Sequence, residues 1–119
     1  PVGTQPAVQT QLRHRGVEVI ELEASTPAAV MAHLYDRGLL SVLWECGGNL
    51  AAQAIATGAV QKLWVFIAPK IIGGVAAPTP IGDLGLTQMT AAYHLDRVQW
   101  QPSGPDLWVE GYLSEPPAA

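Results

Sequence analysis

Two short runs of almost wholly apolar residues constrain the fold of this chain more than any other feature. They are Leu39–Trp44 (LLSVLW) and Lys62–Ala68 (KLWVFIA), and a segment typical of a helix, Asn49–Thr57, lies between them with Gly58 as its stop. Apolar runs of this length suit parallel strands that are covered on both faces of a sheet. The pattern therefore predicts an α/β fold in which a helix connects two central strands.

The preceding segment adds a strand and a helix to this pattern. Gly16–Glu23 (GVEVIELE) alternates with the period of a strand. A helix should then begin at Pro27, with Thr26 as its N-cap, and end at Gly38, because each residue type is favoured at that position. Right-handed crossovers through the two helices predict that the three strands are parallel.

The C-terminal part of the chain predicts a hairpin. Strands are expected over Thr90–Trp100 and Leu107–Leu113, and Gly104-Pro105 between them is a turn signal. The expected fold class is thus α/β, with a mixed, mostly parallel sheet and a C-terminal antiparallel hairpin. Residues 1–12 are expected to form a loop or frayed end, and residues 16–114 to be the structured part of a single domain. The tryptophans all fall on predicted strands and are expected in the core: Trp44, Trp64, Trp100 and Trp108.

Charge and composition exclude several classes of protein. The net charge is −4, and of the six basic residues only Arg13 and Arg15 lie close together, so the chain lacks the basic patch of a nucleic-acid-binding protein. No apolar run approaches the ~18 residues of a transmembrane helix. Cys46 is the sole cysteine and cannot form an intrachain disulfide. These features predict a cytoplasmic protein with neither a nucleic-acid nor a membrane partner.

The segment Val42–Gln53 (VLWECGGNLAAQ) is the strongest candidate for a site. A strand ends there, the chain turns through Gly47 and Gly48, and a helix begins. The first N–H groups of a helix lack internal partners and favour an anion, while glycine leaves room for a phosphate. Glu45 stands at the strand end, where a carboxylate can accept hydrogen bonds from a ring N–H or a hydroxyl. The same residues also suit a plain tight turn and a solvated glutamate.

The stretch Leu43–Gly74 resembles the C-terminal reductase domain of the bifunctional riboflavin-biosynthesis deaminase–reductase. The features that carry the resemblance are Glu-x-Gly after an apolar strand, G-x-V leading into a second strand, and APK-x-x-G at the end of that strand. In this sequence they are Glu45 and Gly47, Gly58 and Val60, and Ala68-Pro69-Lys70 with Gly73. These motifs lie within residues 43–74, whereas the order of elements agrees over most of the chain.

This resemblance implies a dihydrofolate-reductase-like three-layer sandwich, of which the chain would form only the C-terminal part. It implies a homodimer and the NADPH-dependent reduction of 5-amino-6-(5-phosphoribosylamino)uracil, at the ribose C1′, to the ribitylamino product. Glu45 would contact the substrate, and NADPH would be bound by residues of the glycine turn and helix start: Gly47, Gly48, Asn49, Leu50, Ala51, Ala52 and Gln53. No catalytic residue is assigned, because the cofactor carries the chemistry of hydride transfer. Cys46 departs from the family's usual glycine or small apolar residue, and Asn49, although a good N-cap, is not the commonest residue at its position.

The resemblance further implies that the first strands of the domain lie outside these 119 residues. One of them would lie between Leu39–Trp44 and Lys62–Ala68, and without it those runs would have unpaired backbone groups and open apolar faces. We therefore expect the chain alone to be inactive, with a missing half or a partner chain closing the gap. Direct hydrogen bonding between the two runs would contradict this. The family's deaminase half needs zinc and an H-x-E … P-C-x-x-C arrangement, which is absent here, so that domain is expected upstream.

The roles of several residues are open to more than one interpretation, and the sequence also allows two rival functions. Arg13 and Arg15 suit either an adenosine 2′-phosphate or, in preference, a solvated surface. Lys70 suits a structural role slightly better than a functional one, and Gly73-Gly74 suit a turn. The histidines are expected to be structural: His14, His33 and His94. The rival functions are an NADPH-dependent reductase of another pterin-like or pyrimidine substrate, and a non-catalytic fragment of the same fold that binds a ligand or oligomerises, with the C-terminal hairpin as a candidate interface.

Overall fold

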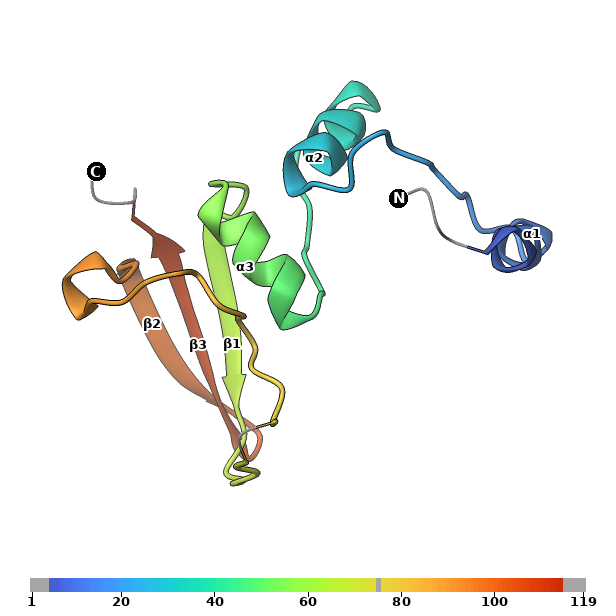
Figure 1. Ribbon diagram of the computed structural model, residues 1–119. Coiled ribbons are helices and arrows are strands. Elements are labelled where there is room, and N and C mark those ends of the chain that lie inside the picture. The colour runs from blue at the N-terminus through green and yellow to red at the C-terminus, as the bar shows by residue number, and fades with distance from the viewer. Residues whose placement is uncertain (1–4, 75, 115–119) are drawn as a thin grey trace. The chain divides into compact units, whose positions relative to one another are not determined.

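The computed structural model describes residues 5–74 and 76–114 (Figure 1). The chain forms two compact units, Pro1–Leu43 and Trp44–Ala119. No helix among the described residues has the length and apolar character needed to cross a bilayer. The elements follow in the order α1 (Pro6–His14), α2 (Pro27–Asp36), α3 (Gly48–Ala56), β1 (Lys62–Ile67), the 3-10 helix η1 (Met89–Ala91), β2 (Leu95–Ser103) and β3 (Asp106–Leu113).

The N-terminal unit begins with α1. The prediction of a loop over residues 1–12 is therefore wrong for residues 6–12, while residues 1–4 lie outside the described part of the chain. Pro6 occupies the first turn, where its missing N–H costs no hydrogen bond, and Arg13 and His14 in the last turn favour the negative end of the helix dipole. These end signals account for the helix better than burial does, since none of its residues is buried.

The second helix, α2, agrees with its prediction at both ends. The Thr26 hydroxyl accepts a hydrogen bond from the Ala29 N–H at 3.2 Å, and Pro27 at the first helical position is buried. Beyond the last turn, Gly38 adopts a φ of +80° and donates its N–H to the Tyr35 carbonyl at 2.8 Å. A left-handed conformation at this position is the reason that glycine ends the helix.

The strands predicted over Gly16–Glu23 and Leu39–Trp44 are not formed. Neither segment is in a helix or strand, and Leu40 and Leu43 are 87% and 66% exposed. A strand is held by hydrogen bonds to a neighbouring strand, and no described residue pairs with either segment in a sheet. The parallel part of the predicted sheet is thus not formed by the described residues, and Leu39–Trp44 is not paired with Lys62–Ala68.

The sheet of the C-terminal unit has three antiparallel strands, with β3 between β1 and β2 (Figure 1). The strand predicted over Lys62–Ala68 is confirmed as β1. Lys62 lies opposite Tyr112 and Ile67 opposite Leu107, so β1 pairs with β3 along its whole length. The other edge of β1 is free of partners among the described residues.

The predicted C-terminal hairpin is also confirmed, with β2 and β3 joined at the Gly104-Pro105 turn. Its first strand begins at Leu95 and not at Thr90, because Met89–Ala91 form a 3-10 turn. The register between β2 and β3 shifts between Asp96 and Gln99, which marks a β-bulge. Within the bulge Arg97 adopts a φ of +52°, a left-handed conformation that non-glycine residues seldom occupy.

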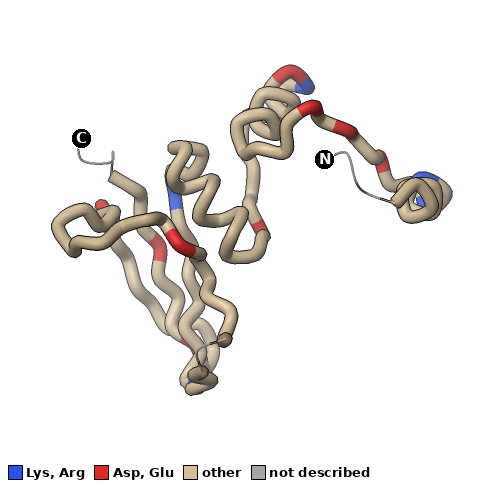
Figure 2. The backbone as a smooth tube through the Cα atoms, viewed as in Figure 1, with Lys and Arg blue, Asp and Glu red and all other residues tan. Residues whose placement is uncertain are grey.

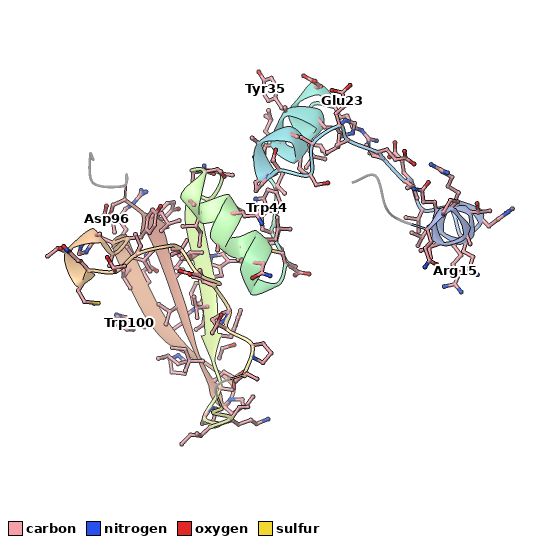
Figure 3. All side chains as sticks on the ribbon, viewed as in Figure 1. Arg15, Glu23, Tyr35, Trp44, Asp96 and Trp100 are labelled. Carbon is pink, nitrogen blue, oxygen red and sulfur yellow. The ribbon has the colours of Figure 1, made fainter. Side chains whose placement is uncertain are left out.

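The core of the C-terminal unit is small. Few of the residues in this unit are charged (Figure 2). Trp64 and Trp100 are 55% and 68% exposed, and Trp100 projects from β2 (Figure 3), so the core prediction is wrong for both. Trp44 and Trp108 are half-buried. Trp64 lies opposite Glu110, on the face of the sheet away from the buried Val109, whereas Trp100 lies opposite Val109 on the edge strand β2. The buried apolar residues are Ala52, Ala54 and Ile55 of α3 and Val109 of β3.

Candidate functional site

The candidate site lies at the start of α3. The helix was predicted over Asn49–Thr57 and is found one residue earlier, over Gly48–Ala56, with Gly47 as the N-cap at φ −74° and ψ 163°. Asn49 is therefore the second helical residue and not the N-cap. The helix ends as predicted before Gly58, which has a φ of +71°.

The first turn of α3 presents unpaired N–H groups. The first helical hydrogen bond runs from the Ala51 N–H to the Gly47 carbonyl at 3.1 Å, and the N–H groups of Gly48, Asn49 and Leu50 have no partner among the described residues. No side chain caps this helix, in contrast to Thr26 at α2, and no acidic residue lies in its first turn. The positive end of the helix dipole is thus available to an anion.

A shallow groove of about 530 Å³ runs beside this helix start. One side consists of the turn itself, and the other is a loop that follows β1 in the chain. All of the lining residues belong to the C-terminal unit: Gly47, Gly48, Asn49, Leu50, Ala77, Pro78 and Thr79.

The two glycines of the turn have different surroundings. Apart from its chain neighbours, Gly47 has no atom within 4 Å of the position that a Cβ atom would take, and it lines the groove. A Cβ atom at Gly48 would lie 2.5 Å from the Thr79 carbonyl oxygen and 3.1 Å from the Gly82 nitrogen. The Gly82 N–H also donates a hydrogen bond to the Gly48 carbonyl at 2.9 Å. Gly48 is thus required for docking the loop, whereas Gly47 leaves space for a ligand.

The remaining predicted site residues divide into two groups. Glu45 is exposed, two residues before the groove, and forms no hydrogen bond or ion pair with a described residue. Gln53 is also exposed, but Ala52 is buried in the core at 6% exposure. The groove therefore brings together Gly47–Leu50, while Ala51, Ala52 and Gln53 do not line it.

Sequence reasoning missed the loop side of the groove. The region after Lys70 is rich in proline, glycine and threonine and was not predicted to belong to the site. Gly73 and Gly74, for which a turn was expected, have φ values of +68° and +106°. A Pro-Thr-Pro-x-Gly stretch predicts a turn. Nothing in such a stretch says which helix it contacts, because that contact joins residues far apart in the sequence.

A polar cluster on the sheet is the other notable arrangement of charges. The Lys62 Nζ lies 2.8 Å from the Glu110 Oε2, and the Trp64 indole N–H donates to the same oxygen at 2.9 Å. The hydrogen bond with Glu110 raises the pKa of Lys62, and the same bond lowers the pKa of Glu110. The Arg97 guanidinium stacks at 3.7 Å on the Tyr112 ring. These groups satisfy one another, which indicates a structural role.

The other residues singled out from the sequence are not among those that line the groove. Arg13 reaches Glu21 at 3.9 Å within the N-terminal unit, and Arg15 is exposed on the turn after α1 (Figure 3). Lys70 is exposed, and Cys46 is half-buried as a free thiol. His14 and His94 are exposed. His33 in α2 has a buried Nε2 atom without a hydrogen-bond partner among the described residues.

Comparison with known proteins gives consistent matches. A riboflavin biosynthesis protein RibD of Synechocystis is 61% identical over 97 residues, which are 82% of this chain and 26% of that protein. A 2,5-diamino-6-ribosylamino-4(3H)-pyrimidinone 5′-phosphate reductase of Methanothermobacter thermautotrophicus is 31% identical over 81 residues, or 68% of this chain and 38% of that protein. The chain thus spans well under half the length of these relatives.

The fold has a counterpart among solved structures. A pyrimidine reductase-like protein of Corynebacterium diphtheriae matches with a TM-score of 0.67 and 25% identity, over 97% of this chain and 48% of that one. This agreement confirms the predicted α/β class as a fragment of a dihydrofolate-reductase-like fold, although its parallel strands are not formed here. Residues 3–109 match the family described as RibD C-terminal domain. The chain therefore belongs to the RibD C-terminal domain family.

Proposed function

We propose that this chain supplies cofactor and substrate contacts to an NADPH-dependent reductase of riboflavin biosynthesis, which converts 5-amino-6-(5-phosphoribosylamino)uracil to its ribitylamino product. The observation that carries the proposal is the uncapped start of α3 beside an open groove. Family membership and the reductase name of the Methanothermobacter relative support the same reaction class.

The residues of the groove fit a dinucleotide phosphate. Unpaired N–H groups of Gly48, Asn49 and Leu50 are donors suited to phosphate oxygens. Gly47 has no neighbour within 4 Å that would obstruct an approaching group. Bound NADPH would supply the hydride, and the chain would bind and orient it. In this proposal the exposed Gln53 contributes its amide, while Ala51 and Ala52 contribute only the backbone of the helix.

Glu45 is the proposed substrate contact. Its exposed carboxylate has no partner among the described residues, and it precedes the groove by two positions. A carboxylate there can accept hydrogen bonds from ring N–H or ribose hydroxyl groups of the pyrimidine. We assign it binding and not proton transfer. In a complete reductase, Glu45→Gln should raise the KM for the pyrimidine and leave NADPH affinity unchanged.

The reductase proposal has further parts. The chain is proposed to be the C-terminal part of a single reductase domain, inactive alone, with the rest of that domain and a deaminase domain upstream. The assembly is proposed to be a cytoplasmic homodimer. The proposal also includes that the reductase uses NADPH and not NADH.

A second candidate is a non-catalytic fragment that binds a ligand or oligomerises. The exposed apolar side chains of Trp64, Phe66 and Trp100 favour it, because large accessible aromatic groups mark contact surfaces. A reductase that acts on another pterin-like or pyrimidine substrate would share the cofactor groove and differ in the substrate contacts.

Binding of NADPH separates these functions. Titration of the chain with NADPH should quench tryptophan fluorescence and give a calorimetric signal, because Trp44 is adjacent in sequence to Glu45 and is half-buried. The variant Trp44→Phe should lose most of the quenching and keep the calorimetric signal. A flat response by both methods at millimolar NADPH would contradict the reductase proposal and favour the non-catalytic fragment.

A further inference from the structure

One face of the C-terminal sheet combines exposed aromatic rings with paired charges. Directly opposite residues of neighbouring strands share a face, so Trp64 lies with Glu110, and Phe66 lies with Trp108. The adjacent Val109 is buried on the other face. We call the first of these the aromatic face. On β1 and β3 (Figure 1) it consists of Lys62, Trp64, Phe66, Trp108, Glu110 and Tyr112.

The polar groups at the centre of the aromatic face satisfy one another. The Glu110 carboxylate accepts hydrogen bonds from the Lys62 ammonium at 2.8 Å and from the Trp64 indole N–H at 2.9 Å. The Glu110 side chain is only 13% exposed. Another surface can therefore cover these three groups and leave each of them with a partner, which avoids the main penalty for burying polar atoms. The aromatic face is thus suited to a protein contact.

The two ends of the aromatic face differ in charge. At one end, the Lys62 Nζ lies 5.1 Å from the centre of the Tyr112 ring, and the Arg97 guanidinium lies 3.7 Å from the same ring. Arg97 is exposed and forms no ion pair with a described residue. At the other end, Phe66 and Trp108 present two aromatic rings. Cations are attracted to the faces of aromatic rings, so each end is complementary to the opposite end and not to itself.

We propose that the aromatic face is the contact between two copies of this chain, related by a two-fold axis that crosses the strands near Trp64. The proposal rests on the homodimer of the proposed function and names its contact. An axis in this direction reverses the strands, so the end with Lys62 and Arg97 lies over the end with Phe66 and Trp108 of the second copy. An axis along the strands would bring the cations of both copies together, and like charges repel.

The area of the aromatic face sets the strength of this contact. Trp64 and Phe66 are 55% and 61% exposed, and their exposed parts amount to about 230 Å² if a whole aromatic side chain covers ~200 Å². A stable interface buries ~800 Å² on each partner, so the two rings supply roughly 30% and the rest of the sheet face must add to them. We therefore expect a weak dimer, which dissociates at about 1 µM and forms at about 200 µM.

Sedimentation velocity over this concentration range tests the contact. The chain should change from monomer to dimer, and Trp64→Ala should raise the dissociation constant of the dimer roughly 30-fold or more, because the substitution removes a central anchor from both copies. Trp100→Ala is the matched control, because Trp100 is 68% exposed and lies on the opposite face, and it should leave the dissociation constant unchanged. Equal melting temperatures of the two variants would show that both are folded.

Two results of this experiment would overturn the contact. A dimer that Trp64→Ala does not weaken would refute the aromatic face and leave the homodimer standing. A chain that stays monomeric at about 200 µM would refute the contact between two copies, and it would agree with a face that the uncovered part of the longer relatives occupies. The NADPH titration is independent of both results, so the reductase proposal is tested separately.

Cross-linking through single cysteines tests the direction of the axis. In a Cys46→Ser background, two copies of Trp64→Cys should be joined by a bismaleimide that spans ~10 Å, the usual separation of packed sheets. Two copies of Phe66→Cys should not be joined, because this residue lies two positions from the axis along the strand. Equal cross-linking of both variants would contradict an axis that crosses the strands.

Discussion

Substitution by alanine at the two adjacent glycines at the start of α3 should affect two different properties, loop docking at Gly48 and ligand binding at Gly47. Gly47 has a φ of −74°, which alanine adopts readily, and a Cβ atom there would meet no atom within 4 Å apart from its own chain neighbours. Gly48 has the Thr79 carbonyl 2.5 Å from the position of a Cβ atom. Alanine at the first position tests the ligand site, and alanine at the second tests the docking of the loop.

The structure gives a magnitude for each change. Ordinary contact begins near 3.4 Å, so Gly48→Ala must move the Thr79 carbonyl by 3.4 − 2.5 = 0.9 Å, and the Gly82–Gly48 hydrogen bond moves with it. Overpacking of this kind costs about 1–3 kcal/mol, offset in part by the helix propensity of alanine. We expect the free energy of unfolding to fall by about 1–2 kcal/mol. Gly47→Ala should cost only about 0.5 kcal/mol, the difference between glycine and alanine at an N-cap.

Urea denaturation followed by tryptophan fluorescence measures these changes, because all four tryptophans lie in the C-terminal unit. Titration with NADPH completes the assay. Gly47→Ala should weaken NADPH binding about tenfold, or about 1.4 kcal/mol, because its methyl group enters the open side of the groove. Equal unfolding free energies for the two variants would refute the loop contact, and unchanged NADPH affinity in Gly47→Ala would refute the phosphate site.

Three further predictions concern packing, charge and the exposed runs. Ile55→Ala, at a side chain only 4% exposed, should lower the free energy of unfolding by about 2–4 kcal/mol in urea; a loss below about 1 kcal/mol would contradict its place in the core. The pKa of Glu110 is lowered, so its pair with Lys62 stabilises the fold above pH 4.5, and this stabilisation is lost as the pH falls through the folded pKa. The pKa of Lys62 is raised, so the stabilisation from Lys62 is present below pH 10.5 and is lost as the pH rises through the folded pKa. Melting temperatures should therefore fall at both extremes, and Glu110→Gln should flatten the acid side; an unchanged acid side would show that other groups dominate. Leu40→Lys, at 87% exposure, should change the unfolding free energy by less than about 0.5 kcal/mol. It should nevertheless reduce co-purification with the part of the Synechocystis riboflavin biosynthesis protein RibD that this chain does not cover, and retained co-purification would show that Leu39–Trp44 is not a contact.

Local signals account for the elements that the sequence predicted correctly. The Thr26 cap and the left-handed Gly38 set both ends of α2 with atoms from within a few residues. The hairpin of β2 and β3 likewise needs only a short turn and two neighbouring segments. Such elements follow from sequence because their hydrogen-bond partners are close in the chain.

The predicted strands that failed depend on partners from elsewhere. An alternating pattern in Gly16–Glu23 and an apolar run in Leu39–Trp44 show compatibility with a sheet, and they do not supply the neighbouring backbone that a strand must pair with. The same reasoning explains the exposure of Trp64 and Trp100, whose burial was inferred from their place on strands. In each case the sequence indicated the preferred environment, and the described residues do not provide it.

The candidate site shows a similar division. The strand end, the glycine turn and the helix start are contiguous, so Gly47–Leu50 emerged as a group from the sequence. The distinction between an open Gly47 and a packed Gly48 depends on a loop that reaches the helix from beyond β1. Sequence spacing cannot give that contact, which is the reason that both glycines were assigned the same role.

The groove and the exposed apolar surface have different implications for activity. Every residue that lines the groove lies within one compact unit, so the chain itself determines the geometry that would hold a nucleotide. The apolar run Leu39–Trp44, which pairs with no described residue, belongs to a chain that matches a solved reductase-like structure over 97% of its own length but only 48% of that structure. If the proposed function holds, nucleotide binding and turnover are separable in this chain. Binding needs the groove alone, whereas hydride transfer also needs a substrate held by residues that pair with Leu39–Trp44.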